Sequence, residues 1–567
     1  MSFPFARLWQ SILLSLLVML SGTWSLVGAE EPFDLLIQNA RIVDGTGNPW
    51  FHGDVAVRGD RIVAIGSQLS GKSKLTIEAQ GLVVAPGFID IHSHSDYLLL
   101  EDGHAQSKIR QGVTTEILGE GFSAGPAQGR RPGRQVTVGK KIWKWTTLDG
   151  YFKALQESGT ATNVASYVGI GAVWESVMGK SFDRPTEPQL VEMEKLVKEA
   201  MEQGALGFSS QVMMPPGSLA TTEEIIRLCR QVKPFGGIYS THIRNEGTGV
   251  FDSVNEAITI GEKAGVPVDI IHLKIADQQY WGRMSEVVAL IEQARARGVN
   301  VQANVYPYTR GNNNLVSIIP PWAHEGGRDK LLERLKDPPT RKKIKHDIIH
   351  GVEGWYNHYT AVGGDWSRML ISGNNRFRGL TMDRVFSLRH PNRKNLDFLE
   401  DFMDLLIEEG GSVSTVYAHH TEKDMNLALQ QPWCSVGSDG SAYAIEGPLR
   451  RGNPHPRNFG TFPRVLGRYV REQKLLTLEN GVRKMTSLNA AKVGLKQRGM
   501  LKEGYFADIT IFDPKQILDQ ATFTKPFQYP TGIKAVIVNG KIVLQDGTHT
   551  DATPGRVLRK TKLPTKP

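Results

Sequence analysis

Short alternating runs of apolar and polar residues mark both ends of the chain. Residues 34–69 carry apolar stretches broken by Asp-Gly, Gly-Asn-Pro and Gly-Asp, and residues 499–547 repeat this pattern. Alternation over a few residues between turn signals is typical of short antiparallel strands. We therefore predict one small β-sandwich domain that both chain ends build, from residues 30–86 and 498–556.

Between these ends, apolar runs alternate with amphipathic stretches. The connectors at 188–204 and 249–265 place apolar residues at i, i+3, i+4 and i+7 and end on Gly, as helices do. Eight β-α units predict an α/β fold, a (β/α)8 TIM barrel over residues 87–497, with its chemistry at the carboxyl ends of the strands. The eight apolar runs end near His94, Glu120, Gly171, Val212, His242, Lys274, Tyr308 and Asp439.

One long segment lies between the predicted strands 7 and 8. It contains a further strand-like run, GSVSTVYAHH, that ends at His420. We interpret about residues 310–420 as an insertion over the barrel mouth, where long insertions are usually lids or substrate walls. The alternative is that this run is itself a barrel strand.

Residues 1–29 have the pattern of a targeting segment. Arg7 is their only charge, an apolar core runs from Ile12 to Leu20, and Gly28-Ala29 precedes two acidic residues. This pattern predicts a cleaved signal peptide and a secreted or periplasmic protein without a stable membrane span. An N-terminal membrane anchor is the alternative, because about 20 residues can span a bilayer.

The composition is that of a soluble globular protein. Of the 567 residues, 40% are hydrophobic and 22% charged, which excludes disorder, collagen and coiled coil. The net charge of +9 owes much to a basic tail at residues 557–567, which we expect to be solvated and frayed; no nucleic-acid partner is expected. The two cysteines, Cys229 and Cys434, form no C-x-x-C pair, so a metal would have to use His and carboxylates.

Histidines and one aspartate follow four of the predicted strands. His92 and His94 form an H-x-H pair, and side chains two apart on a strand can reach one metal ion. Asp96 follows as an orienting carboxylate or a cap. A lone His is usually a core or surface residue and a lone Asp often caps a helix, but their convergence on one barrel face predicts a hydrolytic metal site. The residues that end strands 5, 6 and 8 are His242, His272 and Asp439.

These residues lie in longer stretches that resemble the amidohydrolase superfamily, and within it the N-acyl-D-amino-acid deacylases (D-aminoacylases). The resemblance implies a barrel with a terminal β-sandwich, one or two zinc ions, and hydrolysis of the N-acyl bond of a small molecule, an N-acyl-D-amino acid. The stretches run in family order from about residue 33 to 557 and include APGFIDIHSHSD, GVTTEILGEGFSAGP, THIRNEG, IIHLK, NVYPYT, VGSDG, HPRNFGTFPRVLGRYV and GMLKEGYFADITIFDP.

The resemblance also assigns roles residue by residue. His92 and His94 match one metal subsite, His242 and His272 match the other, and Asp439 matches the metal-linked acid/base. Three further residues fall where the family holds the substrate α-carboxylate: Lys274, Tyr306 and Arg457. A Lys or Arg is often only a solvated charge, and Tyr306 is as suited to packing as to binding.

The sequence departs from the family at three positions. Where the family usually has Gly-Asn-Cys-Gly with a zinc-binding Cys, this chain has Gly119-Glu120-Gly121, so we predict that Glu120 replaces the Cys as a ligand. The alternative is a turn residue between glycines. Asn304 stands where the family has Asp, and Met214 where an aromatic residue is common; both are expected to line or support the pocket.

Two other functions stay open from the sequence. A D-dipeptidase or a cyclic-amide hydrolase of the same superfamily would use the same metal site. A catalytically inactive binding protein is the other alternative, because the strand 2 Cys is missing. The presence of all five His and Asp positions argues against inactivity.

Overall fold

The computed structural model describes residues 31–373, 375–392 and 396–563. The predicted signal peptide and the alternative anchor lie outside the described residues. No helix in these ranges is both long and apolar enough to cross a membrane.

The eight predicted barrel strands form, and every neighbouring pair is parallel. The chain continues from the third strand into β11 (Val168–Gly169), which pairs with the fourth. A parallel bridge between Ser93 and Gly440 joins the first strand to the last, so the predicted TIM barrel is confirmed. The strands are β6 (Phe88–Asp90), β7 (Val113–Leu118), β10 (Asn163–Ser166), β12 (Gly207–Gln211), β13 (Ile238–His242), β14 (Val268–Ile270), β15 (Val301–Val305) and β19 (Cys434–Val436).

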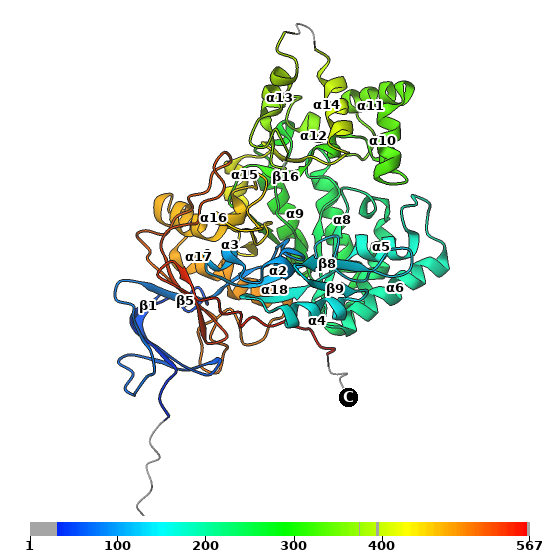
Figure 1. Ribbon diagram of the computed structural model, residues 1–567. Helices are drawn as coiled ribbons and strands as arrows, with labels where there is room; N and C mark the ends of the chain where they lie inside the picture. Colours follow the sequence, from blue (N-terminus) through cyan, green and yellow to red (C-terminus); the bar gives the residue numbers. More distant parts are fainter. Residues whose placement is uncertain (1–30, 374, 393–395, 564–567) are drawn as a thin grey trace, which may run out of the picture.

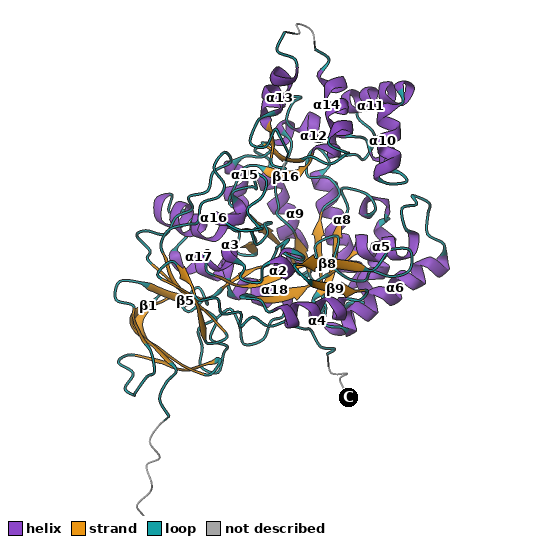
Figure 2. Ribbon diagram, viewed as in Figure 1, coloured by secondary structure: helices purple, strands orange, loops and turns teal. Residues whose placement is uncertain are grey.

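Amphipathic helices surround the strands (Figure 2). The helix at 187–202 shows why: its apolar side chains recur at helical spacing and are buried, and Thr186 and Gln189 cap its start in a capping box. The helices are α2 (Leu98–Glu101), α3 (Gln106–Ile109), α4 (Leu148–Ser158), α5 (Ile170–Met178), α6 (Glu187–Glu202), α7 (Thr222–Arg230), α8 (Val250–Ala264), α9 (Met284–Ala296), α15 (Glu422–Gln430), α16 (Arg457–Arg464), α17 (Leu478–Met485) and α18 (Ser487–Val493). A hairpin of β8 (Arg134–Val138) and β9 (Lys141–Trp145) was not predicted.

Both chain ends build the second domain, beside the barrel (Figure 1). Eight of its nine strands are hydrogen-bonded along one path, and β4 pairs with β1 beside that path. The N-terminal and C-terminal parts join where β5 pairs with β20. Apolar side chains from both parts, among them Ile37, Val55 and Ile509, form its own core. The strands are β1 (Leu35–Ile42), β2 (Phe51–Arg58), β3 (Arg61–Gly66), β4 (Thr76–Glu78), β5 (Val83–Pro86), β20 (Ile509–Phe512), β21 (Ile533–Val538), β22 (Lys541–Gln545) and β23 (Thr548–His549).

The segment between β15 and β19 forms a separate lobe over the barrel mouth (Figure 1). The strand-like run before His420 belongs to a small antiparallel sheet of this lobe and not to the barrel. The lobe has a core of its own that includes Ile348, Trp366 and Phe402, so the predicted insertion is confirmed. Its elements are β16 (Gly311–Asn314), α10 (Arg328–Lys336), α11 (Pro338–His350), α12 (His358–Ala361), β17 (Met369–Ile371), α13 (Met382–Arg389), α14 (Phe398–Glu408) and β18 (Ser414–Tyr417).

The basic tail is held against the barrel as far as the structure describes it. Arg559 forms a 2.8 Å ion pair with Asp149, and Lys560 Nζ donates to the carbonyl of Val493 (2.8 Å). Burial lowers the pKa of Lys560 to about 8. The expectation of a frayed tail is therefore wrong for Arg559 and Lys560, because these two cations have fixed partners on the barrel, whereas residues 561–563 are exposed.

A buried ion pair joins α18 to the barrel strand β14, and its contribution to stability can be tested. Lys492 Nζ is 2.6 Å from Asp269 Oδ1 and also donates to the Ala303 carbonyl and Ser435 Oγ, and both charged side chains are fully buried. We expect Lys492→Met to lower the free energy of unfolding by about 3 to 5 kcal/mol in urea titrations, because Asp269 is left without a counter-charge. The exposed Lys195→Met is the control and should change stability by about 0.5 kcal/mol or less. A loss below about 1 kcal/mol for Lys492→Met would contradict this interpretation.

Candidate active site

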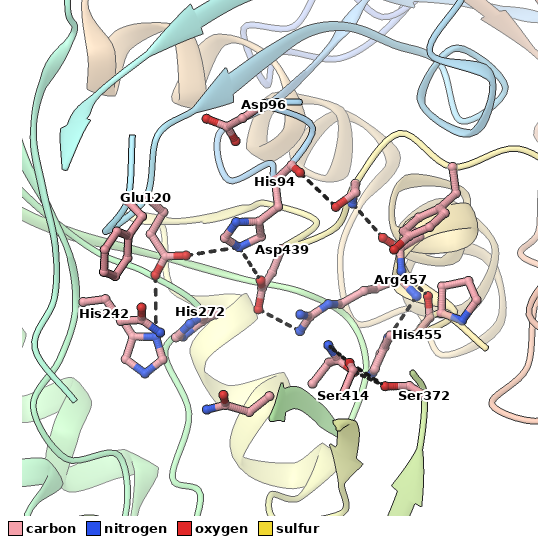
Figure 3. Close-up of a pocket in the computed structure, with 18 of the residues that line it drawn as sticks. His94, Asp96, Glu120, His242, His272, Ser372, Ser414, Asp439, His455 and Arg457 are labelled. Atoms are coloured by element: carbon pink, nitrogen blue, oxygen red, sulfur yellow. Dashed lines mark hydrogen bonds and ion pairs between the residues drawn. The ribbon is translucent and has the colours of Figure 1, made fainter. Parts of the chain in front are cut away.

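The residues predicted to bind metal meet at the carboxyl ends of the barrel strands (Figure 3). The Glu120 carboxylate lies between two pairs of histidines. Its Oε2 is 2.9 Å from His92 Nε2 and 3.1 Å from His94 Nε2, and its Oε1 is 3.6 Å from His242 Nδ1. Two groups of possible ligands therefore share Glu120: His92, His94, Glu120 and Asp439, and Glu120, His242 and His272.

Two of these residues have an unusual backbone conformation. His272 and Asp439 have φ values of 41° and 51°, in a region that residues with a Cβ rarely adopt. Hydrogen bonds hold both conformations: the His272 N–H donates to Asn304 Oδ1 (3.1 Å), and the Asp439 N–H donates to the His92 carbonyl (2.8 Å). Strain of this kind is maintained mainly at functional sites.

The buried carboxylates of the site are ionised. Burial alone would raise the pKa of Glu120, but the charge of His92 and the close approach of the His242 and His92 ring nitrogens hold it well below its usual range. Burial opposes charge on His94 as well, yet hydrogen bonds to Asp439 and Glu120 raise its pKa to about 10. The carboxylates thus favour positive charge at this site, which a bound cation would supply.

The donor atoms fit a divalent metal. His92 Nε2 and His94 Nε2 lie 3.6 and 3.0 Å from Asp439 Oδ1. Glu120 Oε1 is buried without an aligned hydrogen-bond partner among the described residues and lies 3.6 Å from His242 Nδ1. Imidazole nitrogens and carboxylate oxygens are ligands that Zn²⁺ accepts. The thiols of Cys229 and Cys434 are buried elsewhere and belong to neither ligand group.

Lys274 lies on the side of the ligand cluster away from the cavity. Its partner Glu246 was not predicted from the sequence. Lys274 Nζ is 2.6 Å from Glu246 Oε1 and 2.8 Å from His272 Nδ1, and Glu246 Oε1 is itself 3.0 Å from His272 Nδ1. A carboxylate that accepts the Nδ1–H of a histidine leaves Nε2 free to bind a metal. Lys274 does not line the cavity beside the cluster, so its role toward a substrate carboxylate stays a prediction.

This geometry gives a prediction for Glu246. We expect Glu246→Gln to weaken zinc binding by about 10- to 100-fold, because the amide can present an N–H to His272 Nδ1 and no longer fixes its tautomer. Competition with a chromophoric chelator would measure the change. Glu256→Gln is the matched control, since Glu256 pairs with Arg244 and belongs to neither ligand group. Equal zinc affinity of the Glu246 variant and the parent would contradict the assignment.

Arg457 and Tyr306 present unsatisfied donors beside Asp439. Arg457 Nη1 is 2.7 Å from Asp439 Oδ2, and the guanidinium lies 4.8 Å from the centre of the Tyr306 ring. His455 Nδ1 accepts the backbone N–H of Arg457 (3.0 Å) and so fixes the start of α16. Asp439 thus engages Nη1, whereas Arg457 Nε and the Tyr306 hydroxyl are buried without a hydrogen-bond partner among the described residues. An anion placed here would satisfy them.

The cluster opens into a cavity of about 450 Å³. Asp96 also lines it but belongs to neither ligand group, and burial raises its pKa to about 6. Asn304 supports the site from behind, donating to Asp269 Oδ2 (2.8 Å), whereas Met214 packs near Tyr356 outside this cavity. The wall opposite the metal centre was not predicted residue by residue. It comes from the insertion and consists of Asn312, Asn313, Ser372 and Ser414.

Comparison with known proteins defines the class. The amidohydrolase family matches residues 75–304 and 433–544. The chain belongs to this family, and with its His and carboxylate cluster it is a metal-dependent hydrolase of amide bonds.

Several similar proteins within the family are D-amino-acid N-deacylases. The chain is 34% identical to the D-aminoacylase of Alcaligenes xylosoxydans xylosoxydans over 534 residues, which cover 94% of this chain and 98% of that protein. It is 33% identical to the N-acyl-D-aspartate deacylase of the same organism, covering 93% and 95%. The structure of the N-acyl-D-glutamate deacylase of Bordetella bronchiseptica, complexed with zinc and a phosphonate mimic of the tetrahedral intermediate, matches with a TM-score of 0.77 at 31% identity, covering 93% of this chain and 100% of that one. The predicted resemblance is confirmed.

Proposed function

We propose that this protein is a zinc-dependent deacylase that hydrolyses the N-acyl amide bond of N-acyl-D-amino acids. The observation that carries the proposal is the set of unsatisfied donors on Arg457 and Tyr306, immediately beside the predicted acid/base Asp439. An N-acyl amino acid has a carboxylate one carbon from its amide nitrogen. A site that holds this carboxylate therefore brings the amide to Asp439 and the metal ligands.

The residues divide the chemistry of amide hydrolysis between them. Bound zinc would polarise the acyl carbonyl and acidify a water to a pKa of about 7. Asp439 accepts the proton of the attacking water and delivers it to the leaving nitrogen. Its ionised state suits the first step: although burial alone would raise the pKa of Asp439, Arg457 and His92 lower it. Arg457, with Tyr306 beside it, binds the carboxylate through a planar fork of donors.

We also propose that the protein is exported and acts outside the cytoplasm. The support is the sequence pattern of residues 1–29, a single basic residue, a short apolar core and small residues before Glu30. N-terminal sequencing of the protein recovered from the periplasm or medium tests this, and a mature chain that begins at Glu30 is the expected result. A chain that keeps Arg7 and stays with the membrane would favour the anchor.

The activity is tested with the full mature chain loaded with zinc. N-acetyl-D-amino acids, their L enantiomers, D-dipeptides and cyclic amides are compared by kcat/KM. We expect the N-acetyl-D-amino acids to be the best substrates and activity to be lost on chelation and restored by zinc. A preference for cyclic amides, which lack the α-carboxylate, would overturn the proposal. So would failure of every substrate with a fully loaded metal site, which would favour the inactive binding protein.

A further inference from the structure

The wall that the insertion adds to the cavity is polar and carries no charge. Asn312 and Ser414 lie on adjacent antiparallel strands, in a register that pairs Asn314 with Ser414, so they are diagonal neighbours on one face of the sheet. Ser372 follows the third strand and joins them: its Oγ is 2.7 Å from Asn312 Oδ1 and 2.9 Å from Ser414 Oγ. The insertion thus presents a fixed group of hydroxyl and amide atoms to the cavity.

The wall offers no cation of its own to a substrate side chain. Among the described residues that line the cavity, Arg457 is the one Lys or Arg, and it lies against Asp439. A second carboxylate, on the substrate side chain, would lose its hydration against uncharged hydroxyl and amide groups, with no cation to compensate it. An aliphatic side chain would displace water from these polar atoms and offer no hydrogen bond in its place, which costs free energy as well. A carboxamide or hydroxyl both donates and accepts, and it matches this wall.

The position of the wall shows which part of the substrate meets it. The Ser372 carbonyl accepts the backbone N–H of Asn453 (2.9 Å), four residues before Arg457, so the wall adjoins the side of the cavity that would hold the α-carboxylate. Figure 3 shows Ser372 and Ser414 beside His455 and Arg457 and away from Glu120. The aromatic residue Phe122, which also lines the cavity, follows Glu120 by two positions. A substrate held by Arg457 in this way would turn the group on its α-carbon toward the wall and its acyl group toward Phe122.

We propose that the Asn312, Ser372 and Ser414 wall is the side-chain subsite and selects N-acyl-D-amino acids with a neutral hydrogen-bonding side chain, such as D-glutamine or D-asparagine. It selects against both acidic and aliphatic side chains. This inference rests on the proposed deacylase function and names its substrate class.

The test compares nearly isosteric substrates on the zinc-loaded enzyme. We expect kcat/KM for N-acetyl-D-glutamine to exceed that for N-acetyl-D-glutamate and N-acetyl-D-norleucine by about tenfold or more, because a site built to hydrogen-bond a substrate group rejects analogues that lack it. In the variant Ser372→Ala/Ser414→Ala, the glutamine-to-norleucine ratio should fall by about tenfold. Ser387→Ala, an exposed serine on α13 of the same insertion, is the control and should leave the ratio unchanged.

The outcomes separate the two proposals. Hydrolysis of N-acetyl-D-amino acids with D-glutamate or D-norleucine preferred overturns the subsite and leaves the deacylase function standing. No hydrolysis of any of them overturns the deacylase function, and the subsite falls with it. If the double variant does not fold, Ser414→Ala alone is used, and inhibition by free D-glutamine against D-glutamate gives an independent ratio. Equal inhibition by these two amino acids also overturns the subsite.

Discussion

Replacing Asp439 with Asn is expected to lower kcat by about 10² to 10⁴, the range for a lost general acid/base. The carboxylate lies 3.0 Å from His94 Nε2 and 2.7 Å from Arg457 Nη1, so its position and its ionisation are both fixed. An amide of the same shape keeps the packing but cannot accept the proton of the attacking water. Steady-state kinetics on an N-acetyl-D-amino acid measures the loss, and zinc analysis shows whether the Glu120, His242 and His272 group still holds its ion.

Asp277→Asn is the matched control for this variant. Asp277 is also buried and lies on the loop after the sixth barrel strand, but it accepts the backbone N–H of Gln279 (2.9 Å) and belongs to neither ligand group. We expect its kcat to change by less than about tenfold. Near-normal turnover of Asp439→Asn at full zinc content would remove the acid/base role and leave Asp439 as a metal ligand only.

The parts of the fold that follow a local pattern could be predicted from the sequence. The barrel strands are largely buried, and His242 and Asp439 come at or just after the end of such a strand, so they could be placed on one barrel face without a structure. The strand before His420 could not be assigned this way, because an apolar run has the same appearance in the barrel and in the insertion. Its pairing with β16 decides the assignment.

The missed parts depend on contacts between distant segments. Glu246 acts on His272 across 26 positions, and no periodicity connects them. Lys274 shows what strand alternation cannot predict. Alternation correctly places Lys274 on the same side of the strand as His272, but it does not say whether the side chain reaches the cavity. In the structure Glu246 binds the ammonium group. The basic tail was predicted to be solvated because its partner Asp149 is some 400 residues away in sequence.

Replacing Arg457 with Met is expected to lower kcat/KM for an N-acetyl-D-amino acid by an amount that corresponds to about 2 to 5 kcal/mol of activation free energy. This is the range for truncating one partner of a buried charge pair. Methionine has no N–H to replace the free Nε donor, and the substrate carboxylate is left without its cation. The loss should be much smaller for the corresponding amide or methyl ester, which has no carboxylate charge. Comparing kcat/KM on the acid and on the amide measures the difference.

This comparison is needed because Arg457 acts on two groups. It is the largest neighbouring influence that lowers the pKa of the buried Asp439, so its removal should raise that pKa and move the acidic limb of the pH profile to higher pH. The shift in the pKa of Asp439 lowers kcat/KM for acid and amide substrates alike. It therefore cancels in the ratio of the two losses in kcat/KM. Arg457→Lys separates the contributions further, because it keeps the charge near Asp439 but loses the planar fork, so it should recover the pH profile more fully than the preference for the acid. Equal losses on the acid and the amide would show that Arg457 acts only through Asp439, and the cyclic-amide hydrolase would then become the better interpretation of the site.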